Sequence, residues 1–245
     1  MAFMIALGFA LTAPARAENF ATTNVQFLYG GSFHDTYYGY STPSGDLFTT
    51  TLEHFDTWNY GDNFFFVDGL FGNHTDFLGK GTGKHAKGYG EWTPRLSLSK
   101  LTKRPLQFGP ITDVYLAGQF ELGEGYRAYL EGLGFDLKAP GFNTLGLNLL
   151  RRDDNFNDPT YQVTVYWSKP IHIRSLRLSF EGYVDISGTD RDGADVTSQP
   201  QLLLDISRRL HLPEGKCQLG IEWYYHGNRA ISSSVPQALL KWKLH

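Results

Sequence analysis

The sequence lacks several features that stabilise or anchor other proteins. It contains a single cysteine, Cys217, which excludes an intramolecular disulfide. Basic residues are not in excess, because 22 Lys and Arg accompany 25 Asp and Glu for a net charge of −3, and this argues against nucleic acid as a partner. After residue 17, no apolar run approaches the ~18–20 residues that a membrane-spanning helix needs. If the chain enters a membrane, we expect it to do so with strands.

Motifs for catalysis and for cofactor or metal binding are missing as well. The sequence has no H-E-x-x-H and no G-x-S-x-G. The glycine-rich residues 79–85 lack the Walker spacing and its Ser or Thr, and the eight His form no spaced ligand set. We therefore predict no enzymatic activity, no cofactor and no metal. A Ser-His-Asp hydrolase on the outer face stays open, since such triads are spatial.

The N-terminal residues 1–17 stand apart from the rest of the chain. Residues 1–11 are apolar, and Ala15-Arg16-Ala17 fits an A-x-A cleavage site before Glu18. We predict a cleaved signal peptide over residues 1–17 and one domain over residues 18–245. A buried N-terminal helix is the alternative.

The remaining chain is rich in strand and turn formers, with 15% aromatic residues and 27 Gly. Alternating segments are each close to the ~9–11 residues that a tilted strand needs to cross a bilayer. They lie at residues 22–33, 46–58, 63–71, 89–99, 110–121, 126–138, 142–152, 160–169, 174–187, 198–209, 216–226 and 234–244. This pattern predicts an all-β fold, an antiparallel transmembrane β-barrel of about 12 strands, with an even count that leaves both termini in the periplasm.

The stretch around residues 62–68 shows the pattern most clearly. Residues two apart in a strand share a face, so Asp62, Phe64, Phe66 and Asp68 point one way. Phe65, Val67 and Phe71 point the other way. Carboxylates that frame aromatic rings opposite a wholly apolar face are typical of a barrel wall in lipid. A soluble sandwich also alternates and remains the alternative.

The inward face of such a barrel would mix charges of both signs with aromatic rings. We expect it to carry Glu53, Asp62, Asp68, Arg95, Asp113, Glu121, Arg177, Glu181, Asp185 and Glu222. Such groups hydrogen-bond a passing solute, and the rings of Phe55, Phe64, Phe66 and Tyr115 can stack on a flat base. The alternative is that the charges only plug a narrow barrel with ion pairs.

Several of these residues also form recognisable motifs. Glu53-x-Phe55, the run from Asp62 to Asp68, the run from Pro94 to Thr102 and Phe108-Gly109-Pro110 resemble the Tsx/OmpK family of nucleoside-specific outer-membrane channel proteins. The resemblance implies a monomeric, twelve-stranded barrel in the outer membrane of a Gram-negative bacterium, in contact with outer-membrane lipids. It also implies a narrow lumen that passes nucleosides or similar small solutes. The lumen role carries over to Glu53, Phe55, Asp62, Phe64, Phe66, Asp68 and Arg95.

Beside the outer-membrane hydrolase that stays open, two functions follow this resemblance. The first is an outer-membrane channel for passive, selective uptake of nucleosides through an aromatic- and charge-lined lumen. The alternative is a closed or non-specific barrel that acts as a surface receptor or adhesin. In that case its outer loops would be the attachment site for phages or colicins.

Overall fold

The computed structural model describes residues 20–35, 40–41, 45–75 and 80–244, and the signal peptide predicted at residues 1–17 lies outside them. The wall strands are β1 (Ala21–Gly30), β4 (Leu47–Trp58), β5 (Gly61–Phe71), β6 (Ala86–Ser97), β7 (Ile111–Gly123), β8 (Tyr126–Leu137), β9 (Thr144–Asp154), β10 (Thr160–Ile173), β11 (Leu176–Gly188), β12 (Ala194–Ser198), β13 (Gln201–Asp205), β14 (Cys217–Gly227) and β15 (Ser232–Lys243). Two short strands, β2 (His34–Asp35) and β3 (Tyr40–Ser41), pair with each other in the first loop.

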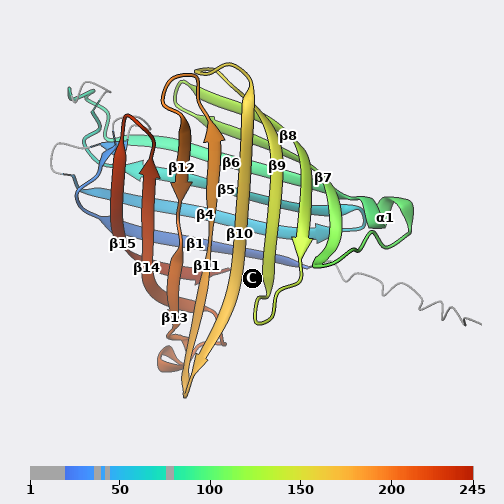
Figure 1. Ribbon diagram of the computed structural model, residues 1–245. Helices are drawn as coiled ribbons and strands as arrows, with labels where there is room; N and C mark the ends of the chain where they lie inside the picture. The colour runs from blue at the N-terminus through green and yellow to red at the C-terminus, as the bar shows by residue number, and fades with distance from the viewer. Residues whose placement is uncertain (1–19, 36–39, 42–44, 76–79, 245) are drawn as a thin grey trace, which may run out of the picture.

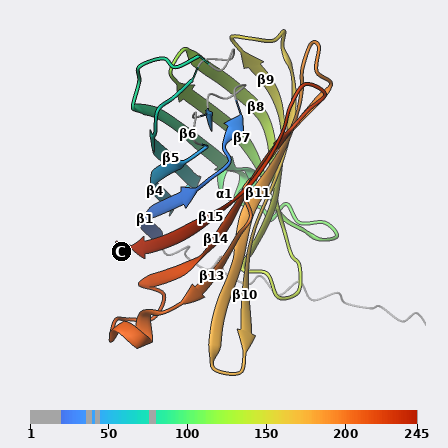
Figure 2. The ribbon, with the colours of Figure 1, turned by 90° about the vertical axis from the view of Figure 1, so that its left-hand side faces the viewer.

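These strands form one closed antiparallel sheet. Neighbours in the chain pair with each other, and β1 closes the ring because it pairs with both β4 and β15. The strands β12 and β13 both lie between β11 and β14, and they are two halves of one wall strand interrupted at Gln199 and Pro200. Proline has no N–H to donate to the ladder. The wall therefore has twelve strands, which confirms the predicted antiparallel barrel (Figures 1 and 2).

The alternation of side chains builds an apolar outside and a polar inside. On β14, Leu219, Ile221 and Trp223 are each half exposed on the outer surface. Their neighbours Glu222 and Tyr224 point inward and are buried. Since successive residues of a strand face opposite sides, the outer surface is a continuous apolar band of the kind that contacts lipid.

The connections distinguish the two ends of the barrel. The outer end carries the loops at residues 31–46, 72–85, 124–125, 155–159, 189–193 and 228–231. The inner end carries both described chain ends, and β1 pairs there with β15 from Asn24 to Lys243. Outer-membrane barrels place their longer loops outside and their termini in the periplasm.

Two connections at the inner end are longer than the others there. Residues 98–110 contain the helix α1 (Leu98–Thr102), which begins at Ser97, whose side chain accepts a hydrogen bond from Lys100 N–H. This helix projects beyond the wall (Figure 1). Residues 206–216 contain a 3₁₀ helix, Ser207–Leu210. The prediction of a strand over residues 198–209 was therefore wrong at its boundaries. None of the helices in the described residues is long and apolar enough to cross a membrane.

Part of the barrel interior is filled. On β7, β8 and β9 the inward side chains Ala117, Ala128, Leu130 and Leu150 form a compact apolar cluster. These side chains pack on one another, with Tyr126 against them, so this sector is a packed core. The open part of the interior lies between two walls, one of β1, β4, β5 and β6 and the other of β10, β11 and β13 to β15. The strands of these two walls run across each other in Figure 1.

Candidate functional site: the lumen

The interior encloses a cavity of about 510 Å³. This volume lies within the ~300–1,000 Å³ typical of small-molecule sites. All seven lumen residues expected from the family resemblance line this one cavity: Glu53, Phe55, Asp62, Phe64, Phe66, Asp68 and Arg95. The alternation of side chains along β4, β5 and β6, which was read from the sequence, thus places these side chains on one surface. Their binding role stays a prediction.

Aromatic rings follow one wall of the cavity from the inner end to the outer end. Phe20 lies 6.3 Å from Phe55 between ring centroids, and Phe55 is the strand partner of Phe64. Phe64 is 6.2 Å from Phe66, and Phe66 is 6.0 Å from Tyr89. These spacings are those of interacting ring pairs. Successive rings within one contact distance offer a flat solute a series of stacking positions.

The inner end of the cavity is held by Arg95. Its guanidinium donates two hydrogen bonds of 2.7 Å to the two carboxylate oxygens of Asp62 and one of 3.2 Å to Asp136. It also lies 4.1 Å from the ring centroid of Tyr115. Asp62 and Arg95 are 5% and 7% exposed. Paired and buried in this way, the two groups form a fixed part of the wall.

This network corrects the expectation for Tyr115. The side chain is 6% exposed beneath Arg95, and its hydroxyl donates a hydrogen bond of 2.7 Å to Asp136. Its face is therefore occupied by the guanidinium and does not line the cavity. Tyr166, on β10, closes the other side of Arg95 and lines the cavity instead.

A second cation crosses the lumen. Lys241 on β15 donates a hydrogen bond of 2.5 Å to Glu181 on β11 and lies 3.6 Å from Glu53 on β4. The strands β15 and β11 are separated in the wall by β14 and β13. Gln26 and Gln201 also bond across the interior, at 2.9 Å. The contacts of Lys241 with Glu53 and of Gln26 with Gln201 connect the two walls, and together these bonds narrow the passage.

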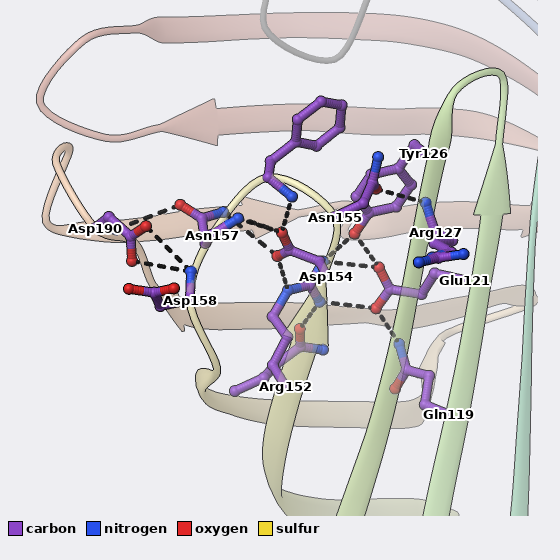
Figure 3. A network of polar contacts seen from close by, with 12 residues as sticks. Gln119, Glu121, Tyr126, Arg127, Arg152, Asp154, Asn155, Asn157, Asp158 and Asp190 are labelled. Carbon is purple, nitrogen blue, oxygen red and sulfur yellow. Dashed lines mark hydrogen bonds and ion pairs between the residues drawn. The ribbon is translucent and has the colours of Figure 1, made fainter.

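The sector beside the packed core is closed by a network around Arg152 (Figure 3). Its guanidinium donates hydrogen bonds of 2.9 Å to both oxygens of Glu121 and one of 3.0 Å to Asp154. Asp154 accepts in turn from the backbone N–H groups of Phe156 and Asn157 in the loop at 155–159. The network therefore fixes an outer loop to the wall, and Glu121 is bound to a cation of the wall.

The first loop folds into the outer end of the barrel. Phe33, 1% exposed, packs against Leu47, Leu70, Tyr224 and Val235. The following Asp35 is fully buried and accepts hydrogen bonds of 2.6 Å from Tyr224 and from His226. Because these partners sit on β14, the loop is anchored inside the wall. The cavity therefore has an apolar outer part in addition to its polar middle.

Exposed charges mark the outer loops. Lys84 donates a hydrogen bond of 2.5 Å to Glu124, and this bond lowers the pKa of the Glu124 carboxyl. Of the glycine-rich residues 79–85, residues 80–85 lie in this outer loop, and residue 79 lies outside the described residues. Across the described ranges, no group of three or more His, Cys, Asp or Glu is arranged to hold a metal ion.

Glu91, Lys241 and Phe20 are among the cavity residues that sequence reasoning missed. Glu91 on β6 faces the lumen in register with Phe66. The alternation of side chains along residues 89–99 could have identified Glu91 as a lumen residue. Lys241 shares its face with Gln237, but its contact with Glu181 joins residues 60 positions apart, which no local pattern indicates. Phe20 precedes the first predicted strand, so its ring contact with Phe55 had no pattern to reveal it.

Comparison with known proteins decides the family. The family model for the nucleoside-specific channel-forming protein, Tsx, matches residues 48–228, well over half of the chain. The chain belongs to this family. The match includes β4 to β14 and with them most of the strands that line the cavity. The family resemblance drawn from the motifs at residues 53–110 is thereby confirmed.

Two curated relatives carry the same relationship at the level of sequence. Outer membrane protein OmpK of Vibrio parahaemolyticus is 33% identical over 101 residues, which cover 39% of this chain and 38% of that protein. OmpK of the serotype O3:K6 strain RIMD 2210633 is 31% identical over 107 residues, 39% of this chain and 40% of that protein. The match thus spans about two fifths of these relatives. Together with the Tsx family and the barrel, it places the chain in the outer membrane.

Solved structures show the same architecture. The KdgM porin, solved alone and in complex with disordered oligogalacturonate, matches with a TM-score of 0.51 in both cases. Each match covers 91% of this chain and 99% of the porin at 7% sequence identity. At this identity the likeness concerns the fold, a closed outer-membrane barrel around a lumen.

Proposed function

We propose that this protein is a passive channel through which nucleosides cross the outer membrane. The observation that carries the proposal is the combination, in one cavity, of a ring series from Phe20 to Phe66 with carboxylates on the same and the facing walls. A nucleoside has a flat base and a hydroxylated sugar. Its base stacks on the rings, at ~1–3 kcal/mol per base, while carboxylates accept hydrogen bonds from its hydroxyls.

The seven lumen residues take different parts in this proposal. Phe55, Phe64 and Phe66 supply the stacking faces. Glu53 and Asp68 supply acceptors, and Asp68 is held in place by a hydrogen bond of 2.5 Å from Thr51. The Asp62–Arg95 pair shapes the inner exit. Several weak positions in series suit transport, because a solute held at one strong site would not leave.

Membership of the Tsx family supports nucleosides as the solutes, since the family is described as nucleoside-specific. The passage needs no covalent chemistry in this account. Solute moves down its gradient through hydrogen bonds and stacking contacts alone.

The proposal is tested by flux into vesicles. Phospholipid vesicles that contain the refolded protein receive labelled uridine or labelled glucose outside, and the internal label is followed with time. Uridine influx that saturates with concentration, together with much slower glucose influx, supports the proposal. Equal influx of both solutes, or influx of neither, contradicts it. A Phe64→Ala variant serves as a matched test, because it removes one stacking face and leaves every charged lumen residue in place.

A further inference from the structure

The charges that line the cavity are strongly unbalanced. Seven carboxylates line it, against the cationic side chains Arg95 and Lys241. Each of these cations is already engaged by two acids: Arg95 by Asp62 and Asp136, and Lys241 by Glu53 and Glu181. The acids left over are Asp68, Glu91, Asp185 and Glu222, which we call the carboxylate ring. Among the described residues, none of the four forms an ion pair with Lys or Arg.

The ring surrounds the cavity. Asp68 and Glu91 come from β5 and β6 on one wall, and Asp185 and Glu222 come from β11 and β14 on the other. Members on opposite walls act on each other electrostatically, Glu222 with Asp68 and Glu91 with Asp185. Arg152 attracts Glu91 and Asp185, and Lys241 attracts Glu222, but both cations are bonded elsewhere.

Neutral donors fix each member in its position. Asp68 accepts from Thr51 at 2.5 Å and Asp185 accepts from Thr164 at 2.5 Å. Glu91 accepts from Tyr89 at 2.7 Å and from Gln119 at 3.0 Å. Hydrogen bonds of this kind orient a carboxylate without supplying a positive charge. The ring is thus a built array of acceptors to which, among the described residues, no Lys or Arg is bonded.

A second observation points to a ligand at Glu222. Its two oxygens accept from Gln201 at 2.7 Å and from Gln237 at 3.0 Å. The other amide atom of Gln237, the oxygen Oε1, is buried on the cavity wall and has no hydrogen-bond partner in the part of the chain that the structure describes. An unsatisfied acceptor costs free energy where it is shielded from water. A cation or an N–H group beside Glu222 would satisfy it.

We propose that the carboxylate ring makes the lumen cation-selective and binds small cations, namely alkali ions and protonated amines, at Glu222 and Gln237. Rings of Asp and Glu select cations in other channels by the same electrostatics. Close like charges in a confined space attract a counter-ion and repel chloride and phosphate groups. The inference concerns ions and does not depend on which neutral solute the lumen passes.

The test is the reversal potential of the refolded full chain in a planar bilayer under a tenfold KCl gradient, with no nucleoside present. We expect the wild type to pass K⁺ over Cl⁻ by about tenfold or more. Glu222→Gln keeps the side-chain size and the acceptor for Gln201, and we expect it to lower this ratio several-fold. Asp68→Asn should act in the same direction, and the double variant should approach no selectivity.

The matched control is Glu131→Gln. Glu131 loses the same charge, but its side chain is 68% exposed and lies outside the cavity. We expect its selectivity to equal that of the wild type. An anion-selective or unselective wild type overturns the proposal, as does a Glu222→Gln channel as selective as the wild type. A control that shifts as far as Glu222→Gln also overturns it, because surface charge would then be the cause.

Binding is tested separately with spermidine, a polyamine cation. Added to symmetric KCl, spermidine should reduce the open current of the wild type, and Glu222→Gln should weaken this block about tenfold. Glu222→Asp keeps the carboxylate and should retain both the spermidine block and the cation selectivity. This control shows that substitution at residue 222 does not by itself abolish them. A wild-type current that spermidine does not reduce refutes the binding site.

Discussion

Replacing Arg95 with methionine removes the only cation that contacts Asp62 within the described residues and keeps a side chain of similar length. Asp62 would then lie 5% exposed without the two hydrogen bonds of 2.7 Å that now neutralise it. Removing one partner of a buried pair typically costs about 3–5 kcal/mol, because the remaining charge is uncompensated. We expect Arg95→Met to lower the free energy of unfolding by about this amount.

A double-mutant cycle separates the pair from other effects of the substitution. In the Arg95→Met background, Asp62→Asn removes the uncompensated charge and should restore about 2–3 kcal/mol. The assay is urea unfolding of the barrel in phospholipid vesicles, followed by tryptophan fluorescence. The control Arg151→Met breaks an exposed pair with Glu131 at 3.2 Å, whose Arg side chain is 52% exposed, and should cost less than about 1 kcal/mol. If the changes in unfolding free energy of the two single variants sum to that of the double variant within ~0.5 kcal/mol, the coupling is refuted.

The remaining predictions concern stacking and backbone fit. Phe66→Ala interrupts the ring series and should weaken nucleoside binding about 5- to 150-fold, as the ~1–3 kcal/mol of one stacking contact implies. Phe65→Ala, on the lipid face, should leave nucleoside titrations of channel current unchanged, and an equal loss in both variants would contradict the account. Gly220→Ala would place its Cβ 2.0 Å from the carbonyl oxygen of Leu202 and should reduce the refolded yield. Gly118→Ala, whose nearest neighbour is at 3.8 Å, should refold normally.

The wall of the barrel could be predicted from the sequence because its period is local. Alternation along β5 placed Asp62, Phe64, Phe66 and Asp68 on one face, and the structure puts all four on the cavity wall. A strand repeats every two residues wherever one face is buried and the other lies in lipid. The same logic gave the strand count, since the twelve segments differ from the observed strands mainly at their ends.

What the sequence could not show depends on contacts across the lumen. Tyr115 has the inward parity that was expected, but Arg95 from the neighbouring β6 covers its face. Lys241 reaches Glu181 over two intervening strands, a contact that exists only once the barrel is closed. The strand expected to run to residue 209 ends at Asp205, where the side chain accepts from the N–H groups of Ser207 and Gly215 and fixes the turn.

The apolar outer part of the cavity was also not apparent. It depends on Phe33, which the sequence pattern placed at the end of a strand over residues 22–33. In the structure β1 ends at Gly30, and Phe33 lies in the following loop and packs on Leu47 and Tyr224. Loop residues carry no periodicity, so nothing in the local pattern distinguishes a ring that enters the lumen from one exposed to water.

The central claim is that the lumen binds nucleosides through its aromatic wall, and single-channel current tests it most directly. The refolded protein is inserted into a planar bilayer, and adenosine or glucose is titrated into the bathing solution. Our account predicts that the open current falls saturably with adenosine and not with glucose, and that Phe66→Ala shifts the half-blocking concentration upward. A current that adenosine leaves unchanged, or that glucose reduces equally, would contradict it.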